Sequence, residues 1–156
     1  MKIEIGQPAI DFTLNDNENN PFTLSAHRGK RVVMLFFPKA FTDVCTEELC
    51  SVRDTLSDYN ELNATVVGIS CDTVEVLNKF KSDQQLNFPL LSDETREVSF
   101  NYGSLYQSAP DDMGGVSKRS AFVIDENGDL LHAEVLEDGY QIPDFNAVLS
   151  SLKGSK

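Results

Sequence analysis

The chain has little positive charge, few cysteines and no long apolar segment. Its 156 residues include 25 Asp and Glu but only 13 Lys and Arg, which gives a formal net charge of −12 at pH 7. Nucleic acids and anionic membrane surfaces attract proteins with an excess of Lys and Arg, so neither is an expected partner. No run approaches the ~20 apolar residues of a membrane span, and residues 1–6 lack the apolar segment of a signal peptide. We therefore expect a soluble, cytoplasmic protein.

The three cysteines, Cys45, Cys50 and Cys71, lie at unequal spacing. A framework of structural disulfides needs pairs of cysteines, whereas an odd number suits a reducing compartment with reactive or buried thiols. Neither histidine, His27 nor His132, lies at metal-ligand spacing from a cysteine, so a zinc site built from Cys45, Cys50 and a histidine has no support. We expect no metal, flavin or haem.

A length of 156 residues with 40% hydrophobic content predicts one domain spanning residues 1–156. Apolar runs at residues 32–37 and 65–70 have the length of strands and predict strands buried on both faces. After each run, apolar side chains recur at three-and-four spacing and predict an amphipathic helix, so we expect parallel strands joined by right-handed crossovers. The first apolar stripe is Leu49, Val52, Leu56 and Tyr59, and the second, capped by Asp72 or Thr73, is Val76, Leu77 and Phe80.

Further elements extend this core at both ends of the chain. Residues 12–14 and 22–24 predict an N-terminal β-hairpin, and residues 119–125 predict a strand that returns antiparallel at residues 129–136. Pro143 is expected to open a last helix, because proline suits the first helical position. We expect the last four residues, from Lys153 on, to form a frayed tail.

Between these elements lie a short helix and a long loop. Residues 92–94 are expected to cap a brief helix that ends at Phe100 or Tyr102. Residues 103–118 show no hydrophobic period and contain proline and glycine, which predicts a loop. Long loops in compact domains commonly carry function, so we expect this loop to border the active site or a subunit contact.

Cys45 falls in the first turn of the helix that follows the first buried strand. Pro38 ends this strand, because proline has no N–H for the ladder and fixes its own φ, and Thr42 or Asp43 can cap the helix. A helix N-terminus has partial positive charge and unpaired N–H groups, which favour a thiolate over a thiol. A lone buried cysteine is more commonly an inert apolar residue, but Pro38, Thr42 and the helix start together indicate a nucleophile.

The pattern Pro38-x-x-x-Thr42-x-x-Cys45 after a buried strand resembles the active-site signature of peroxiredoxins. Its continuation through Cys50 most resembles the alkyl hydroperoxide reductase E group of one-cysteine peroxiredoxins, with the bacterioferritin comigratory protein group as neighbour. The order of elements is similar to a thioredoxin-like α/β fold, a central mixed sheet flanked by helices, with an N-terminal β-hairpin extension. The resemblance also implies a homodimer or a larger homo-oligomer.

The resemblance implies a thiol-dependent peroxidase. Cys45 would attack hydrogen peroxide, an organic hydroperoxide or peroxynitrite and become a sulfenic acid, while Thr42 and Arg119 hold the substrate oxygens and Pro38 covers the thiolate. From the residues alone Arg119 has no stronger claim than the other arginines, and its place in the family-like stretch at residues 119–125 is what the resemblance adds. The resemblance also suggests that Glu48 orients active-site arginines.

Cys50 leaves two routes for the recycling of Cys45. In the bacterioferritin comigratory protein group, a cysteine five residues after the nucleophile forms a disulfide with it, which thioredoxin would reduce. In the alkyl hydroperoxide reductase E group, a cysteine at that place need not do so. Five residues along a helix separate two Cα atoms by about 8.7 Å, and disulfides rarely span more than about 7 Å, so this bond requires the first helical turns to unwind. Residues 47–49 next to Cys50 also resemble the one-cysteine pattern more closely, so we favour an external reductant (thioredoxin, a glutaredoxin-like protein or a low-molecular-weight thiol) and keep the intramolecular disulfide as the alternative.

Two other classes of protein fit the sequence less well. A thiol-disulfide oxidoreductase normally has Cys-x-x-Cys, whereas four residues separate Cys45 from Cys50. A non-enzymatic thioredoxin-like binding or chaperone module would tolerate Cys45→Ser without functional loss, and a peroxidase would not. Cys71, at the end of an apolar strand with no polar constellation around it, is expected to be an inert buried residue.

Overall fold

The computed structural model describes residues 4–41, 43–105, 116–136 and 142–154, with only the backbone of residues 43–45 and 154. Within these residues the strands form one seven-stranded mixed sheet in the order β2-β1-β5-β4-β3-β6-β7. The predicted N-terminal hairpin is confirmed as the antiparallel pair β1 and β2. The strands are β1 Thr13–Asp16, β2 Pro21–Thr23, β3 Arg31–Phe36, β4 Ala64–Ser70, β5 Leu90–Ser92, β6 Arg119–Ile124 and β7 Leu130–Leu136.

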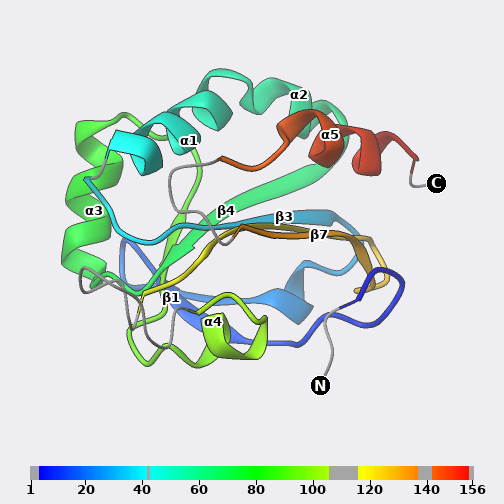
Figure 1. Ribbon diagram of the computed structural model, residues 1–156, viewed down its shortest axis with the longest axis horizontal. Coiled ribbons are helices and arrows are strands. Elements are labelled where there is room, and N and C mark those ends of the chain that lie inside the picture. The colour runs from blue at the N-terminus through cyan, green and yellow to red at the C-terminus, as the bar shows by residue number, and fades with distance from the viewer. Residues whose placement is uncertain (1–3, 42, 106–115, 137–141, 155–156) are drawn as a thin grey trace.

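Helices cover both faces of the sheet. Figure 1 shows α1, α2 and α5 together on one side of the sheet and α4 on the other. The helices are α1 Asp43–Asp54, α2 Leu56–Glu61, α3 Val74–Asp83, α4 Glu97–Asn101 and α5 Phe145–Gly154, with a 3₁₀ turn at Leu24–His27. None of the described helices is long and apolar enough to cross a membrane.

Strand β3 lies between two hydrophobic cores because alternate side chains point to opposite faces of the sheet. Val33 and Leu35 pack into the core that α1, α3 and α5 cover. Val32, Met34 and Phe36 pack into the core on the other face. The predicted strand with both faces buried is confirmed, and the loop that leads to α1 starts at its end.

The predicted first helix is wrong in one respect, since it is divided at Thr55. Thr55 has φ −118°, outside the helical region, and its hydroxyl donates to the carbonyl of Ser51 at 3.0 Å. Such a bond competes with the backbone ladder and bends helices. The stripe still packs inward as predicted, with Leu49, Val52 and Tyr59 all buried.

Two other predicted segments differ from the structure. Helix α4 begins only at Glu97, because Arg96 has a left-handed backbone with φ 68°. Asp93 caps the helix as predicted, although it lies several residues before the helix begins. Its carboxylate accepts hydrogen bonds from the N–H groups of Val98 at 3.3 Å and Ser99 at 2.7 Å. At the end of the chain, α5 runs to Gly154, so the tail predicted from Lys153 is helical for two residues.

Strand pairing brings three distant segments to one edge of the sheet. Strands β3 and β4 are parallel, and the pair Phe36↔Ile69 aligns their carboxyl ends. Strand β6 is antiparallel to β3, and the pair Phe36↔Ser120 aligns its first residues with the last of β3. The loop after β3, the residues after β4 and Arg119 therefore lie side by side.

The ends of the long loop are held together at the same edge. Leu105 and Ser117 form an isolated bridge, and the Ser104 hydroxyl donates to the Lys118 carbonyl at 2.9 Å. Residues 106–115, the middle of the loop predicted to border the active site, lie outside the described residues. The described ends show that this loop leads directly into Arg119.

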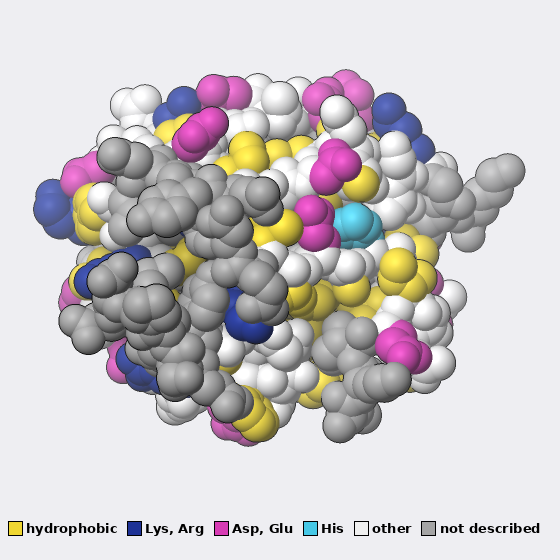
Figure 2. All heavy atoms as spheres, viewed as in Figure 1, with side chains coloured by type: hydrophobic (Ala, Val, Ile, Leu, Met, Phe, Trp, Pro, Cys, Tyr) yellow, Lys and Arg dark blue, Asp and Glu magenta, His cyan; other side chains and the backbone are white. Residues whose placement is uncertain are grey.

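The visible surface agrees with the composition. On the face in Figure 2, the described acidic and basic side chains are interspersed, and the basic ones do not gather into a patch. This face therefore does not offer the concentrated positive charge by which proteins bind nucleic acids.

Candidate active site

The loop between β3 and α1 leads to the candidate nucleophile. The N–H of Phe37 still donates to the Ile69 carbonyl at 2.9 Å, and the ladder then stops at Pro38, as predicted, because proline has no N–H. Pro38 is buried, as is Ala40. Helix α1 begins at Asp43, so the backbone of Cys45 lies in its first turn. Thr42 and the side chain of Cys45 lie outside the described residues.

The position of Cys45 has a defined electrostatic character. Helix α1 has 12 residues, enough for aligned peptide dipoles that place partial positive charge at its first turn. The first N–H groups of a helix also have no intrahelical acceptor. A thiol at this position is therefore in an environment that favours its ionised form.

Glu48 and Arg119 form a buried ion pair one turn further along α1. Arg119 Nη1 lies 2.7 Å from Glu48 Oε1, with 2% and 0% of the two side chains exposed. Glu48 lies three residues after Cys45, and residues three apart on a helix are neighbours, so Glu48 binds the Arg119 guanidinium one turn after Cys45. The contact is the one that the resemblance suggested for these residues, and their part in catalysis stays a prediction.

Burial determines the titration of Glu48. Loss of hydration raises its pKa to about 7, although the charge and the hydrogen bond of Arg119 act in the opposite direction. Its Oε1 accepts from Arg119, whereas the buried Oε2 has no hydrogen-bond partner among the residues that the structure describes.

The other arginines that the sequence could not exclude are less buried than Arg119 and bond to other groups. Arg31 bonds Glu126 at 2.9 Å and the Leu62 carbonyl at 3.1 Å. Arg96 is exposed and donates to the Glu94 carbonyl. Arg119 is the one buried arginine in the part of the chain that the structure describes, a distinction that hydrophobic patterns could not reveal.

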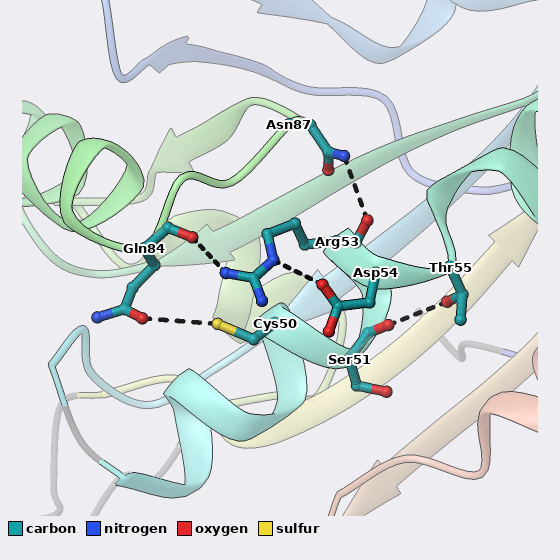
Figure 3. A network of polar contacts seen from close by, with 7 residues as sticks. All are labelled: Cys50, Ser51, Arg53, Asp54, Thr55, Gln84 and Asn87. Atoms are coloured by element: carbon teal, nitrogen blue, oxygen red, sulfur yellow. Dashed lines mark hydrogen bonds and ion pairs between the residues drawn. The ribbon is translucent and has the colours of Figure 1, made fainter.

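Cys50 lies on the side of α1 that faces the end of α3 (Figure 3). Its Sγ is 3.6 Å from Gln84 Oε1, within reach of a thiol hydrogen bond, and its side chain is half-buried. Arg53 Nη1 donates to the backbone carbonyl of Gln84 at 2.6 Å. Because α1 is continuous from Cys45 to Cys50, the two residues keep the helical separation that a disulfide does not span.

Cys71 has polar neighbours that the sequence analysis did not predict. Its Sγ lies 3.5 Å from the Ser117 hydroxyl and 3.9 Å from the Ser99 hydroxyl, and these two oxygens are 2.7 Å apart. The serines come from segments far away in the sequence, so no local pattern could show them. Cys71 is half-buried, and the expectation that it lacks polar neighbours is wrong. Burial raises the pKa of its thiol, and its inertness stays a prediction.

The histidines are engaged elsewhere. His27 stacks on Phe22 with ring centroids 4.3 Å apart, and burial lowers its pKa. His132 contacts Glu134 at 3.4 Å on β7. No group of three His, Cys, Asp or Glu side chains among the described residues is arranged to hold a metal ion.

Sequence reasoning missed one residue at the site, Asp72. The sequence predicts Asp72 or Thr73 as the cap of α3, and Thr73 is the N-cap, since its side chain accepts the N–H of Val76. The Asp72 carboxylate instead accepts the N–H of Ala40 at 2.8 Å, in the loop that precedes Cys45. The contact joins residues 32 positions apart, so only the parallel pairing of β3 and β4 could have indicated it.

Comparisons with known proteins agree with this arrangement. The model of the AhpC/TSA family matches residues 5–133. Peroxiredoxin Bcp of Bacillus subtilis is 37% identical over 133 residues, 84% of each chain, and chloroplastic peroxiredoxin Q of Sedum lineare is 35% identical over 155 residues, 97% of this chain and 81% of that protein. The crystal structure of peroxidoxin BcpB from Mycobacterium tuberculosis superposes with a TM-score of 0.87 at 31% identity over 99% of both chains.

These relatives carry the names Bcp and peroxiredoxin Q, and none of the three carries the name alkyl hydroperoxide reductase E. They support the bacterioferritin comigratory protein group, which the sequence resembles second, rather than the alkyl hydroperoxide reductase E group, which it was expected to resemble most. The superposition over the whole chain confirms the predicted thioredoxin-like fold. The chain therefore belongs to the AhpC/TSA family and is a peroxiredoxin, a thiol peroxidase.

Proposed function

We propose that Cys45 is the peroxidatic cysteine of this thiol peroxidase. Its thiolate attacks one oxygen of a hydroperoxide, the O–O bond breaks, and the other oxygen leaves as an alcohol or water after taking a proton. The sulfur is oxidised to a sulfenic acid and the peroxide is reduced. The observation that carries this proposal is the buried pair Glu48–Arg119, one turn from Cys45 at the start of α1.

The residues around Cys45 divide the work of catalysis. Arg119, held by Glu48, supplies positive charge for the sulfur anion and for the departing oxygen, because preorganised donors in a site without water are effective where charge develops. Thr42 offers a hydroxyl to the peroxide, and the buried Pro38 keeps the approach to the sulfur narrow. Hydrogen peroxide, organic hydroperoxides and peroxynitrite all present the O–O bond that this chemistry needs.

For the recycling of Cys45 we favour Cys50 as the resolving cysteine. The relatives carry the names Bcp and peroxiredoxin Q, which moves the balance from the one-cysteine route to the group in which a cysteine five residues on forms the disulfide. After the first turns of α1 unwind, the Cys50 thiolate would attack the sulfenic sulfur, the S–O bond would break, and the hydroxide would leave as water after taking a proton. Thioredoxin would then reduce the disulfide, and the enzyme would work as a homodimer or a larger assembly.

Replacement of Cys45 tests the first proposal. The Cys45→Ser variant should lose thiol-dependent peroxide reduction completely, because a serine hydroxyl is not ionised at neutral pH. Cys71→Ser is the matched control and should retain the activity, since burial raises the pKa of the Cys71 thiol and disfavours its thiolate. The measurement is hydrogen peroxide consumption with dithiothreitol as reductant. Activity that survives in Cys45→Ser would contradict the assignment.

Intact mass distinguishes the two routes of recycling. After one equivalent of peroxide, the wild-type protein should lose two hydrogens, as an internal disulfide forms, and Cys50→Ser should gain one oxygen as a sulfenic acid. Thioredoxin-dependent turnover should fall at least tenfold in Cys50→Ser, while the first oxidation of Cys45 keeps its rate. A stable gain of oxygen in the wild-type protein, with full turnover in Cys50→Ser, would show the one-cysteine route.

The role of Arg119 is tested in a background that leaves no carboxylate unpaired. A buried acid without its partner destabilises a protein, so Glu48→Gln is compared with Glu48→Gln/Arg119→Ala. The added loss of Arg119 should lower the thiolate fraction of Cys45 and slow its oxidation about 100-fold. Alkylation rates against pH report the thiolate, and stopped-flow mixing with peroxide reports the oxidation. If Arg119→Ala changes neither, Arg119 has no part in the mechanism.

The buried carboxyl group of Glu48 predicts a pH dependence of stability. Its pKa rises from 4.5 to about 7 on folding, so between these values the folded state holds a proton that the unfolded state has released. The resulting stabilisation is complete below pH 4.5 and is lost as the pH rises through 7, a change of about 3 kcal/mol. Urea unfolding gives the free energy of unfolding of the wild-type protein and of Glu48→Gln. The wild-type value minus the Glu48→Gln value should fall as the pH rises. A difference that grows with pH would mean that Arg119 keeps Glu48 ionised.

A further inference from the structure

The loop that precedes Cys45 is fastened to the neighbouring strand by a carboxylate. Asp72 follows β4, and its Oδ2 accepts both the N–H of Ala40 and the hydroxyl of Ser70, each at 2.8 Å. Ala40 is buried and lies three residues before the first residue of α1. The N–H that Asp72 binds thus belongs to the segment that determines where the helix, and with it Cys45, begins.

Asp72 is itself held in place before it binds the loop. The Ser92 hydroxyl, at the end of β5, donates to the Asp72 carbonyl at 2.6 Å. The N–H of Asp72 donates to the Ser70 hydroxyl at 3.2 Å, while that hydroxyl donates to the carboxylate. Because Ser70 is fully buried and Ser92 nearly so, the carboxylate has a fixed position relative to the sheet.

The loop needs such an anchor, because its next residue is strained. Phe41 has φ 68°, a conformation that costs a bulky residue free energy and persists only where surrounding contacts impose it. Its ring lies edge-on against Phe80 of α3, with centroids 5.1 Å apart, but 47% of the residue is exposed. The contact with Phe80 restrains the Phe41 side chain, and the hydrogen bond from Ala40 to Asp72 restrains the backbone just before Phe41.

We propose that Asp72 is a positioning residue of the peroxidase, which fixes the start of α1 and so the placement of Cys45 through the N–H of Ala40. The inference rests on the proposed role of Cys45 and adds to it the contact that sets the geometry. Asp72 touches neither substrate nor sulfur in this role. It acts by keeping the strained loop in the conformation that the attack on peroxide requires, and misplacement of reacting groups by even 1 Å is costly.

Three substitutions distinguish the positioning role of Asp72 from an effect of its charge and from a general loss of stability. Asp72→Ala removes the acceptor, whereas Asp72→Asn removes the charge and keeps one oxygen that can accept from Ala40 and Ser70. Asp125→Ala is the matched control, because Asp125 is also partly buried and its carboxylate accepts two backbone N–H groups, each at 2.9 Å. It follows β6 at the opposite end of β3, where Val32 pairs with Ile124.

Two measurements are made on each reduced protein. Stopped-flow oxidation of Cys45 by hydrogen peroxide should slow at least about tenfold in Asp72→Ala and stay close to the wild-type rate in Asp72→Asn and Asp125→Ala. Hydrogen exchange at the Ala40 amide should accelerate at least about tenfold in Asp72→Ala alone, because a broken hydrogen bond exposes that N–H to solvent. Cys50→Ser is present in all proteins, so that only the first oxidation is observed.

Each outcome has a definite reading. Unchanged oxidation in Asp72→Ala, or unchanged exchange at Ala40, overturns the proposal. Equal loss in Asp72→Asn and Asp72→Ala assigns the effect to charge and also overturns it, and equal loss in Asp125→Ala assigns it to stability. If the parent protein does not react with peroxide through Cys45, the proposed function fails instead, while exchange at Ala40 still reports whether the anchor exists.

Discussion

The site depends on the antiparallel pairing of β6 with β3. In the parallel core of an α/β fold, the carboxyl ends of the strands meet at one edge, and their loops carry the functional groups. Here the register Phe36↔Ser120 brings the beginning of β6 to that same edge. Arg119 is therefore placed beside the loop that leads to Cys45, although 74 positions separate these two residues in the chain. A shift of one residue in this pairing would turn Arg119 to the opposite face of the sheet.

The buried pair of Glu48 and Arg119 has a cost that function explains better than stability. Removing two ions from water is expensive, and their attraction in the interior only partly offsets it. Among the described residues, one carboxyl oxygen of Glu48 has no hydrogen-bond partner, so the hydration that this oxygen loses on burial is not replaced there. The arrangement fixes a guanidinium in a position closed to solvent, where charge interactions are stronger than in water, and this is what the proposed role of Arg119 requires.

Local patterns were enough to predict the scaffold, because the apolar run of β3 and the stripe of α1 report burial directly. Cys45 in a first helical turn followed from the same patterns, with Pro38 ending the strand. Contacts between distant segments could not be predicted in this way. Arg119 was singled out by resemblance alone, and the serines at Cys71 and the bond from Ala40 to Asp72 were missed. These contacts arise from strand register, which no single segment contains. The break at Thr55 was local, but it depends on a hydroxyl bond to Ser51 that competes with the helix.

The same contacts bear on how an oxidised Cys45 would reach Cys50. Unwinding the first turns of α1 releases the hydrogen bonds of that helix end, and a loop still held at Ala40 by Asp72 and at Phe41 by Phe80 resists the movement. The strain at Phe41 works in the other direction, since a left-handed phenylalanine gains free energy when the turn opens. Anchor and strain thus oppose each other in one short segment. On the proposed two-cysteine route the two act at different steps, because the proposed attack on peroxide uses the folded turn and the proposed disulfide with Cys50 uses its release.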